Sequence, residues 1–118
     1  MNETTEILIE AREWLSDPKH WMKHDYGILN RTGSSILPNG KRTIYQSNCM
    51  FGAVREVAQS HNSTHGMDAV IRLEVVAAEQ FPEILKETGT FIGSFNDHSS
   101  FTHDDVLTVF DKAILNDD

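Results

Sequence analysis

Residues 93–106 (GSFNDHSSFTHDDV) concentrate the side chains of this sequence that are most capable of chemistry. The stretch contains one Asn, three Asp, two His and four hydroxyl side chains. Carboxylates and imidazoles of this kind serve as general acids and bases. Thr102 and Asp105 also have the spacing of a capping box, and Asp104 would meet the positive end of the helix dipole. Helix capping therefore accounts for these three residues, whereas residues 95–98 still lack an explanation.

Cys49, the only cysteine, is a candidate nucleophile. A thiol in the first turn of a helix is exposed to the helix dipole, which favours the thiolate. A nucleophilic cysteine also needs an imidazole base and an orienting partner. His98 with Asp97, or His103, would supply these groups if the fold brings them close to the thiol. The alternative is an inert, buried side chain that packs near Phe51.

The middle of the chain is basic, and both flanks are acidic. Residues 18–55 carry six Lys or Arg against one Asp, which gives +5. Residues 1–17 carry five acids against one Arg, and residues 56–118 carry twelve acids against three basic residues. Uneven charge of this kind is typical of a solvated surface. It also agrees with a local anion site inside an acidic protein.

An anion site is expected where the basic middle meets the next helix. Lys41 and Arg42 precede that helix, and the N–H groups after Ser47 and Asn48 would bind an anion at its start. Aromatic side chains nearby, including Tyr26, would stack on a base, although each one alone fits a core position equally well. Asn and Asp after Phe95 also commonly bond to their own backbone in turns. The expected ligand-binding residues are Lys41, Arg42, Ser47, Asn48, Trp21, Tyr45, Asn96 and Asp97.

Two histidine pairs have a spacing that metal sites use. His20 and His24 are four residues apart, as are His61 and His65. On a helix, each pair would lie on one face. Such pairs arise readily by chance among six histidines, and the sequence has neither a second cysteine nor an HExxH motif. We therefore expect no metal site and no cofactor.

The hydrophobic pattern predicts a mainly α fold, or an α+β fold, in a single domain over residues 1–118. Four or five helices are expected, each with one apolar face. Ile71 and Val75 widen the apolar face of the third helix, which is therefore expected to be central. Asn2 or a neighbouring polar residue caps the first helix, and Pro18 ends it. The predicted helices cover about residues 2–16, 47–60, 67–80, 82–89 and 102–115.

The segments between these helices contain most of the turn-forming residues. Residues 19–46 lack a helical period and form either a short β-hairpin or an irregular excursion. The strands of the hairpin would be residues 26–29 and 42–45. Ser47 or Asn48 would cap the helix that follows. Residues 90–95 are expected to be an extended connector.

Composition excludes several classes of protein. Apolar residues make up 39% and charged residues 24% of the 118 residues, as in a globular protein. The net charge of −8 argues against general nucleic-acid binding. No apolar run is long enough to span a membrane, and the first residues lack the pattern of a signal peptide. A lone cysteine favours a reducing environment, so we expect a cytoplasmic protein.

Three motifs resemble those of a known but uncharacterised family of small actinobacterial and bacteriophage proteins. A Trp precedes a glycine-bearing stretch over residues 21–27. Cys49 to Ala53 resembles the Cys-x-x-Gly-Ala helix start of the family. Residues 95–97 and 102–107 resemble its Trp-Asn-Asp turn and Thr-His-x-x-Val-Leu helix, with Phe95 in place of the usual Trp. The resemblance implies a shared fold and packing of the Asn-Asp turn against the Cys49 helix, and it implies no particular reaction.

These observations favour a small phage-type or bacterial binding protein. Its partner would be a nucleotide-like anionic ligand, which it sequesters, or a host defence protein, which it blocks. The alternative is a cysteine-dependent hydrolase or transferase that uses Cys49 with His98 or His103. Acidic mimicry of nucleic acid is a third hypothesis, although the acids fall mostly on the polar faces of amphipathic helices. Self-association is a further open expectation.

Overall fold

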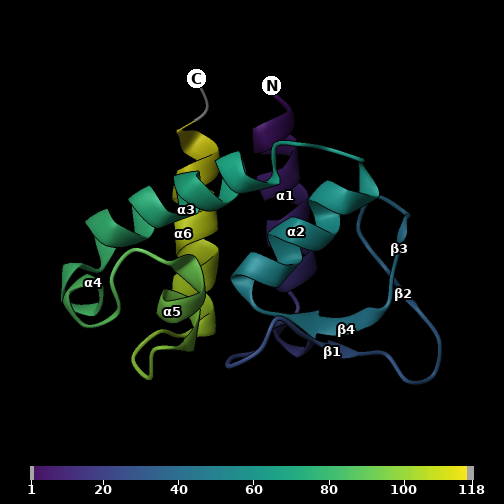
Figure 1. Ribbon diagram of the computed structural model, residues 1–118, viewed down its shortest axis with the longest axis horizontal. Helices are drawn as coiled ribbons and strands as arrows, with labels where there is room; N and C mark the ends of the chain where they lie inside the picture. Colours follow the sequence, from purple (N-terminus) through teal and green to yellow (C-terminus); the bar gives the residue numbers. More distant parts are fainter. Residues whose placement is uncertain (1, 117–118) are drawn as a thin grey trace.

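Four helices enclose the hydrophobic core in a computed structural model that describes residues 2–116. Helices α1 (Glu3–Leu15) and α6 (His103–Leu115) lie side by side, and α2 (Met50–Ser60) and α3 (Gly66–Gln80) cross in front of them (Figure 1). The largest fully buried side chains include Phe95, Phe101 and Phe110. The α+β fold expected from the sequence is confirmed.

Several helix boundaries follow the signals that the sequence suggested at Asn2, Pro82, Gly89 and Thr102. The Asn2 side chain accepts a hydrogen bond from the Thr5 N–H at 2.8 Å and caps α1. Thr102 and Asp105 form the predicted capping box of α6, with reciprocal bonds of 3.2 and 2.9 Å. The short helix α4 (Pro82–Thr88) begins at its proline and ends at Gly89, whose φ of 73° suits glycine.

The extended connector predicted for residues 90–95 is wrong, because residues 92–97 form the short helix α5 (Ile92–Asp97). Gly93 and Ser94 favour a helix only weakly. Tertiary contacts supply what the local sequence lacks. Ile92 and Phe95 are buried, and the Ile92 N–H donates to a Glu74 carboxylate oxygen of α3 at 2.9 Å. The segment expected to be the Asn-Asp turn is therefore the last turn of this helix.

The excursion at residues 19–46 is a nested pair of two-stranded ribbons (Figure 1). It begins with the 3-10 helix η1 (Pro18–His20). Strand β1 (Gly27–Leu29) pairs antiparallel with β4 (Tyr45–Asn48), and β2 (Ser35–Ile36) pairs antiparallel with β3 (Arg42–Thr43). The predicted strand positions are nearly right, but their pairing is not. Residues 42–43 pair with the inner strand β2, and the partner of β1 begins only at Tyr45.

Helix α3 contacts α1, α2 and α6, as its central position in the sequence pattern suggested. The expected burial of its widened face is wrong, since Ile71 is 53% and Val75 is 51% exposed. These two side chains continue an exposed line that begins with Met67. No helix within residues 2–116 has both the length and the apolar character that a membrane crossing requires.

Candidate functional site

Asn96 joins three segments of the chain at the start of α2. Its side chain is fully buried. The carboxamide oxygen accepts from the Trp21 indole N–H at 2.7 Å and from the Met50 N–H at 3.1 Å. The amide nitrogen donates to the Met22 carbonyl at 2.9 Å. The expected packing of the Asn-Asp segment against the helix that starts near Cys49 is therefore present.

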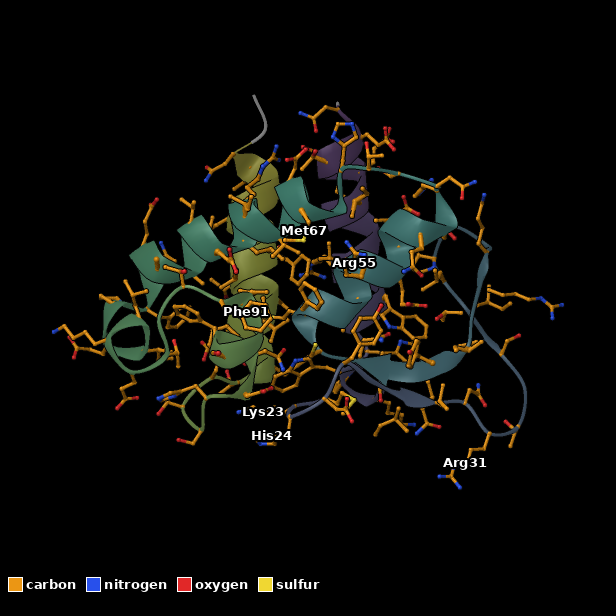
Figure 2. All side chains as sticks on the ribbon, viewed as in Figure 1. Lys23, His24, Arg31, Arg55, Met67 and Phe91 are labelled. Atoms are coloured by element: carbon orange, nitrogen blue, oxygen red, sulfur yellow. The ribbon has the colours of Figure 1, made fainter. Side chains whose placement is uncertain are left out.

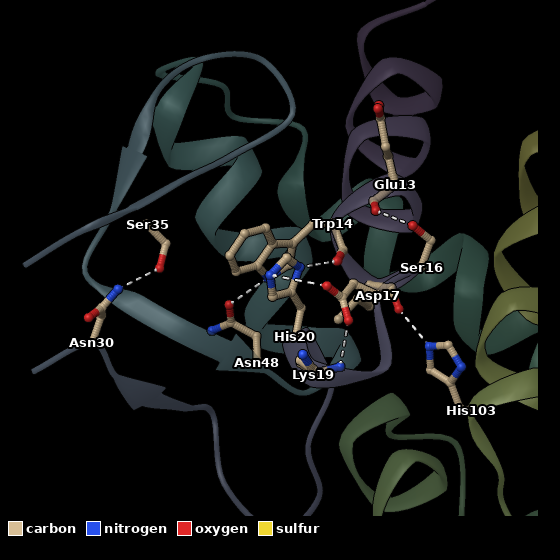
Figure 3. Close-up of polar contacts among 11 residues, drawn as sticks. Glu13, Trp14, Ser16, Asp17, Lys19, His20, Asn30, Ser35, Asn48 and His103 are labelled. Carbon is tan, nitrogen blue, oxygen red and sulfur yellow. Dashed lines mark hydrogen bonds and ion pairs between the residues drawn. The ribbon is translucent and has the colours of Figure 1, made fainter. Parts of the chain in front are cut away.

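Asn48 is a second buried junction (Figure 3). Its side-chain oxygen accepts from the Trp14 indole at 3.2 Å, and its amide nitrogen donates to the Tyr26 carbonyl at 3.2 Å. Trp21 and Asn96 already bond to each other in the first junction. The polar groups of these three predicted ligand-binding residues, Trp21, Asn48 and Asn96, are thus used to tie the chain together.

Cys49, rather than the predicted Ser47 or Asn48, is the N-cap of α2. Its sulfur accepts from the Gly52 N–H at 3.3 Å, and its own N–H donates to the Tyr26 carbonyl at 3.2 Å. Glycine is required at position 52 because a Cβ atom there would lie 2.2 Å from the same carbonyl oxygen. The N–H groups of residues 49, 50 and 52 therefore have protein acceptors, and they are not available to an anion.

The basic residues expected at this helix start lie elsewhere. Asn39, next to the hairpin turn, donates to the Ser60 hydroxyl at the far end of α2 at 2.9 Å. Lys41 and Arg42 follow it and are exposed. Arg31 lies at the outer end of the ribbon (Figure 2). Ser47 is 3% exposed, and Tyr45 packs edge-on against Tyr26 with ring centroids 5.2 Å apart. The expected anion site is not assembled.

A cavity of about 300 Å³ opens beside the start of α2. Of the residues singled out from the sequence, the candidate nucleophile Cys49, the predicted ligand-binding residue Asp97 and the stacking candidate Tyr26 reach it. The wall comes from the segment before β1, the first turn of α2 and the segment around α5. The lining residues are His24, Asp25, Tyr26, Cys49, Phe51, Phe91, Gly93, Ser94 and Asp97.

Three aromatic rings form much of this wall. The Phe51 ring lies edge-on to Tyr26 at 6.2 Å and to Phe91 at 5.6 Å between centroids. Phe91 is 51% exposed, and a Cβ atom on Gly93 would lie 2.5 Å from its ring. Burial and a hydrogen bond to Glu56 raise the pKa of Tyr26, so its hydroxyl stays protonated.

Asp97 holds the polar side of the cavity in place. One carboxylate oxygen accepts from the His24 N–H at 2.7 Å and from the Asn96 amide at 3.1 Å. The other oxygen receives no hydrogen bond from residues 2–116. His24 has a φ of 74°, which is unusual for a residue with a side chain. Figure 2 shows His24 at the turn before β1, with Phe91 above it beside α5.

The environment of Cys49 opposes the expected thiolate. The residue is 5% exposed, and burial raises the pKa of its thiol, with a further contribution from the Asp97 charge. His98 bonds to the Glu87 carboxylate, and the His103 Nε2 lies 2.6 Å from the Leu15 carbonyl oxygen. Neither imidazole lines the cavity. The expected set of nucleophile and base is therefore not brought together.

The histidine pairs also separate. The His20 ring stacks on Trp14 with centroids 3.8 Å apart (Figure 3). His24, in contrast, lies at the cavity. His61 bonds to Glu10, and His65 bonds to Asp68. The part of the chain that the structure describes contains no group of three or more His, Cys, Asp or Glu side chains placed to hold a metal ion.

Sequence reasoning missed most of the cavity. The sequence presents His24 only as one of a metal-binding pair, and it places Phe91 in a connector. The signal that could have found them is weak: an exposed aromatic residue two positions before a glycine, and a His-Asp-Tyr run before a strand. Their meeting depends on the docking of α5 against α2, which no local pattern reveals.

The fold and the cavity define a small α+β protein with an aromatic-lined pocket at a helix start. Residues 1–116 match the model of a family described as Family of unknown function (DUF6197). The chain belongs to this family, so its expected membership of an uncharacterised family is confirmed. No curated protein and no solved structure matches it significantly.

Proposed function

We propose that this protein is a binding protein without chemistry that holds a small molecule in the aromatic-lined pocket. The observation that carries the proposal is the convergence of three aromatic rings and the Asp97 carboxylate on one cavity. Ligand pockets are typically concave and mostly apolar, with a few fixed polar groups, and about 300 Å³ is the lower end of their usual size.

The chemistry of the lining favours binding over catalysis. The candidate nucleophile in the cavity, Cys49, is held as a thiol by burial. Its cap bond to Gly52 gives it a structural role. The same geometry disfavours the nucleotide-like anion expected from the sequence, because the cavity is lined by two carboxylates and the N–H groups of Cys49, Met50 and Gly52 already have acceptors.

The proposal also covers the cellular compartment in which the protein acts. The protein would act in the cytoplasm of a bacterium or a phage-infected cell, where the free thiol of Cys49 stays reduced. There it would lower the free concentration of a small molecule by sequestering it. Such a role requires tight binding and no turnover.

A fragment screen followed by NMR tests the proposal. Binders are expected to shift the amide signals of residues 24–26, 49–52 and 91–97. Phe91→Ala should weaken them about tenfold, because it removes an exposed aromatic wall. Ile71→Ala is the matched control, since Ile71 is equally exposed but lies on α3 outside the pocket. Binders that map elsewhere, or a library without binders, would contradict the proposal.

A second candidate function is the blocking of a host protein, and the exposed line on α3 favours it. Ile71 and Val75 border a groove of about 370 Å³ that Glu74 and Glu79 also line. Met67 extends the apolar line by one turn. An acidic, apolar groove is complementary to an amphipathic helix with Lys or Arg along its edges. We propose such a basic helix as its occupant.

A designed amphipathic peptide with Lys edges is the probe for this second function. Fluorescence anisotropy should detect binding to the wild-type protein and to Leu115→Asp, because Leu115 is 82% exposed outside the groove. Ile71→Asp should abolish binding. A peptide with Glu edges should not bind. Equal binding of both peptides, or binding that survives Ile71→Asp, would refute this candidate.

A further inference from the structure

We propose that the ligand of the aromatic-lined pocket is an organic cation, an ammonium group carried on a small apolar body. This inference rests on the proposed function, since it names the ligand class of the same pocket. Aromatic rings attract cations through the negative charge on their faces. Tyr26, Phe51 and Phe91 supply these rings from three separate segments.

Carboxylates add a negative charge at the same place. Asp97 has one oxygen fixed by the His24 N–H and the Asn96 amide, which orients the carboxylate, and its other oxygen has no donor within residues 2–116. Asp25 also lines the cavity. A bound ammonium group would donate to the open oxygen of Asp97, which completes the hydrogen bonding of that carboxylate.

No Lys or Arg side chain lines the cavity within the described part of the chain. The nearest candidate in sequence is Lys23, whose ammonium donates to the His98 carbonyl at 2.6 Å and lies 5.7 Å from the Trp21 ring centroid. It does not line the cavity, and neither does any other Lys or Arg of residues 2–116. The imidazole of His24, which lines the cavity, makes no hydrogen bond to residues 2–116.

The alternatives fit less well. An anion would meet two carboxylates and would find no free helix N–H group at Cys49 or Met50. A neutral apolar molecule would fill the aromatic wall but would leave the open Asp97 oxygen without a donor and partly desolvated, which weakens binding. The order of affinity expected from the lining is therefore cation, then neutral molecule, then anion.

Three probes that share a phenyl ring and differ in charge test this order of affinity. They are phenethylammonium, 2-phenylethanol and phenylacetate. Calorimetric titration of the full chain at about pH 8, where free imidazole groups are neutral, compares them. Phenethylammonium should bind at least about tenfold more tightly than the alcohol, because cation–π and carboxylate contacts both favour it. Phenylacetate should not bind measurably.

Asp97→Asn isolates the charge. Asparagine keeps an acceptor oxygen for the His24 N–H, so the turn should stay in place, while the affinity for phenethylammonium should fall to that of the alcohol. Glu83→Gln is the control, because it changes the net charge equally at a side chain that is 84% exposed and does not line this cavity. This variant should keep the preference for the cation.

The outcomes separate the two proposals. If the alcohol binds as tightly as the cation to the wild-type protein, the ligand class is wrong and the pocket still stands. The class is also wrong if none of the three probes binds while the fragment screen finds ligands at residues 24–26 and 91–97. A preference for the cation that survives Asp97→Asn overturns the role of this carboxylate. Absence of binding in both experiments overturns both proposals.

Discussion

Replacement of the buried Asn96 by Ala should destabilise the protein more than a typical substitution does. The change removes the acceptor of the Trp21 indole and of the Met50 N–H, and it removes the donor to the Met22 carbonyl. Three polar groups from two segments lose their partner at once. The alanine side chain is too short to replace any of these bonds.

The magnitude follows from the burial of each orphaned group. Met50 is fully buried, so its unpaired N–H should cost about 1–3 kcal/mol. Trp21 and Met22 are half-buried and can recruit water, which limits the loss to about 0.5–1.5 kcal/mol each. The space left by the missing carboxamide adds about 1 kcal/mol. The sum is about 3–7 kcal/mol, a large part of the stability of a domain this size.

Urea unfolding followed by circular dichroism measures this loss directly. The matched control is Asn116→Ala, an exposed asparagine at the end of α6, which should change stability by no more than about 0.5 kcal/mol. In a thermal melt, Asn96→Ala should lower the midpoint by roughly 10–30 °C. A loss below about 1 kcal/mol would show that the carboxamide does not hold these segments together, and would refute this reasoning.

Three further perturbations have defined outcomes. Gly52→Ala should destabilise the protein by about 2 kcal/mol or more in urea unfolding, because its Cβ would lie 2.2 Å from the Tyr26 carbonyl oxygen. Gly66→Ala should cost less, because the nearest atom to its Cβ would be 3.1 Å away. Equal losses would contradict the close approach at Gly52. Burial raises the pKa of the Cys49 thiol, so this thiol ionises in the unfolded chain before it does in the folded protein as the pH rises. The wild-type protein should therefore lose more stability than Cys49→Ala between about pH 8 and about pH 10. Parallel curves of stability against pH for the two proteins would refute this. Thr102→Ala should cost about 1 kcal/mol in thermal unfolding, since it removes one half of the capping box, and an unchanged midpoint would argue against that cap.

The long helices could be predicted because the information is local. Apolar residues recur at helical spacing, and Asn2, Thr102 and Gly89 mark helix ends through their own side chains or backbone. Helix α5 could not be predicted in this way. Its first N–H group is capped by Glu74 of α3, and its buried face exists only because α2 and α3 lie beside it.

The predictions for the candidate site were also only partly correct. The prediction that the Asn-Asp segment meets the Cys49 helix is confirmed by the bond from the Met50 N–H to Asn96. The expected approach of Lys41 to the start of α2 is not seen, because Asn39, two residues before it, bonds to Ser60 at the other end of that helix. This placement depends on strand pairing rather than composition. The prediction of a Cys49 thiolate is wrong because the effect of burial on the pKa outweighs that of the helix start. Burial is a property of the whole fold.

The two asparagine junctions make the tryptophans of this protein selective reporters. Trp14 bonds to Asn48 and Trp21 bonds to Asn96, so both indoles sit where the segment after α1 meets the rest of the chain. Their fluorescence during refolding should follow the docking of that segment, whereas far-ultraviolet circular dichroism follows the formation of the helices. A delay between the two signals would place the assembly of the pocket after that of the helical core.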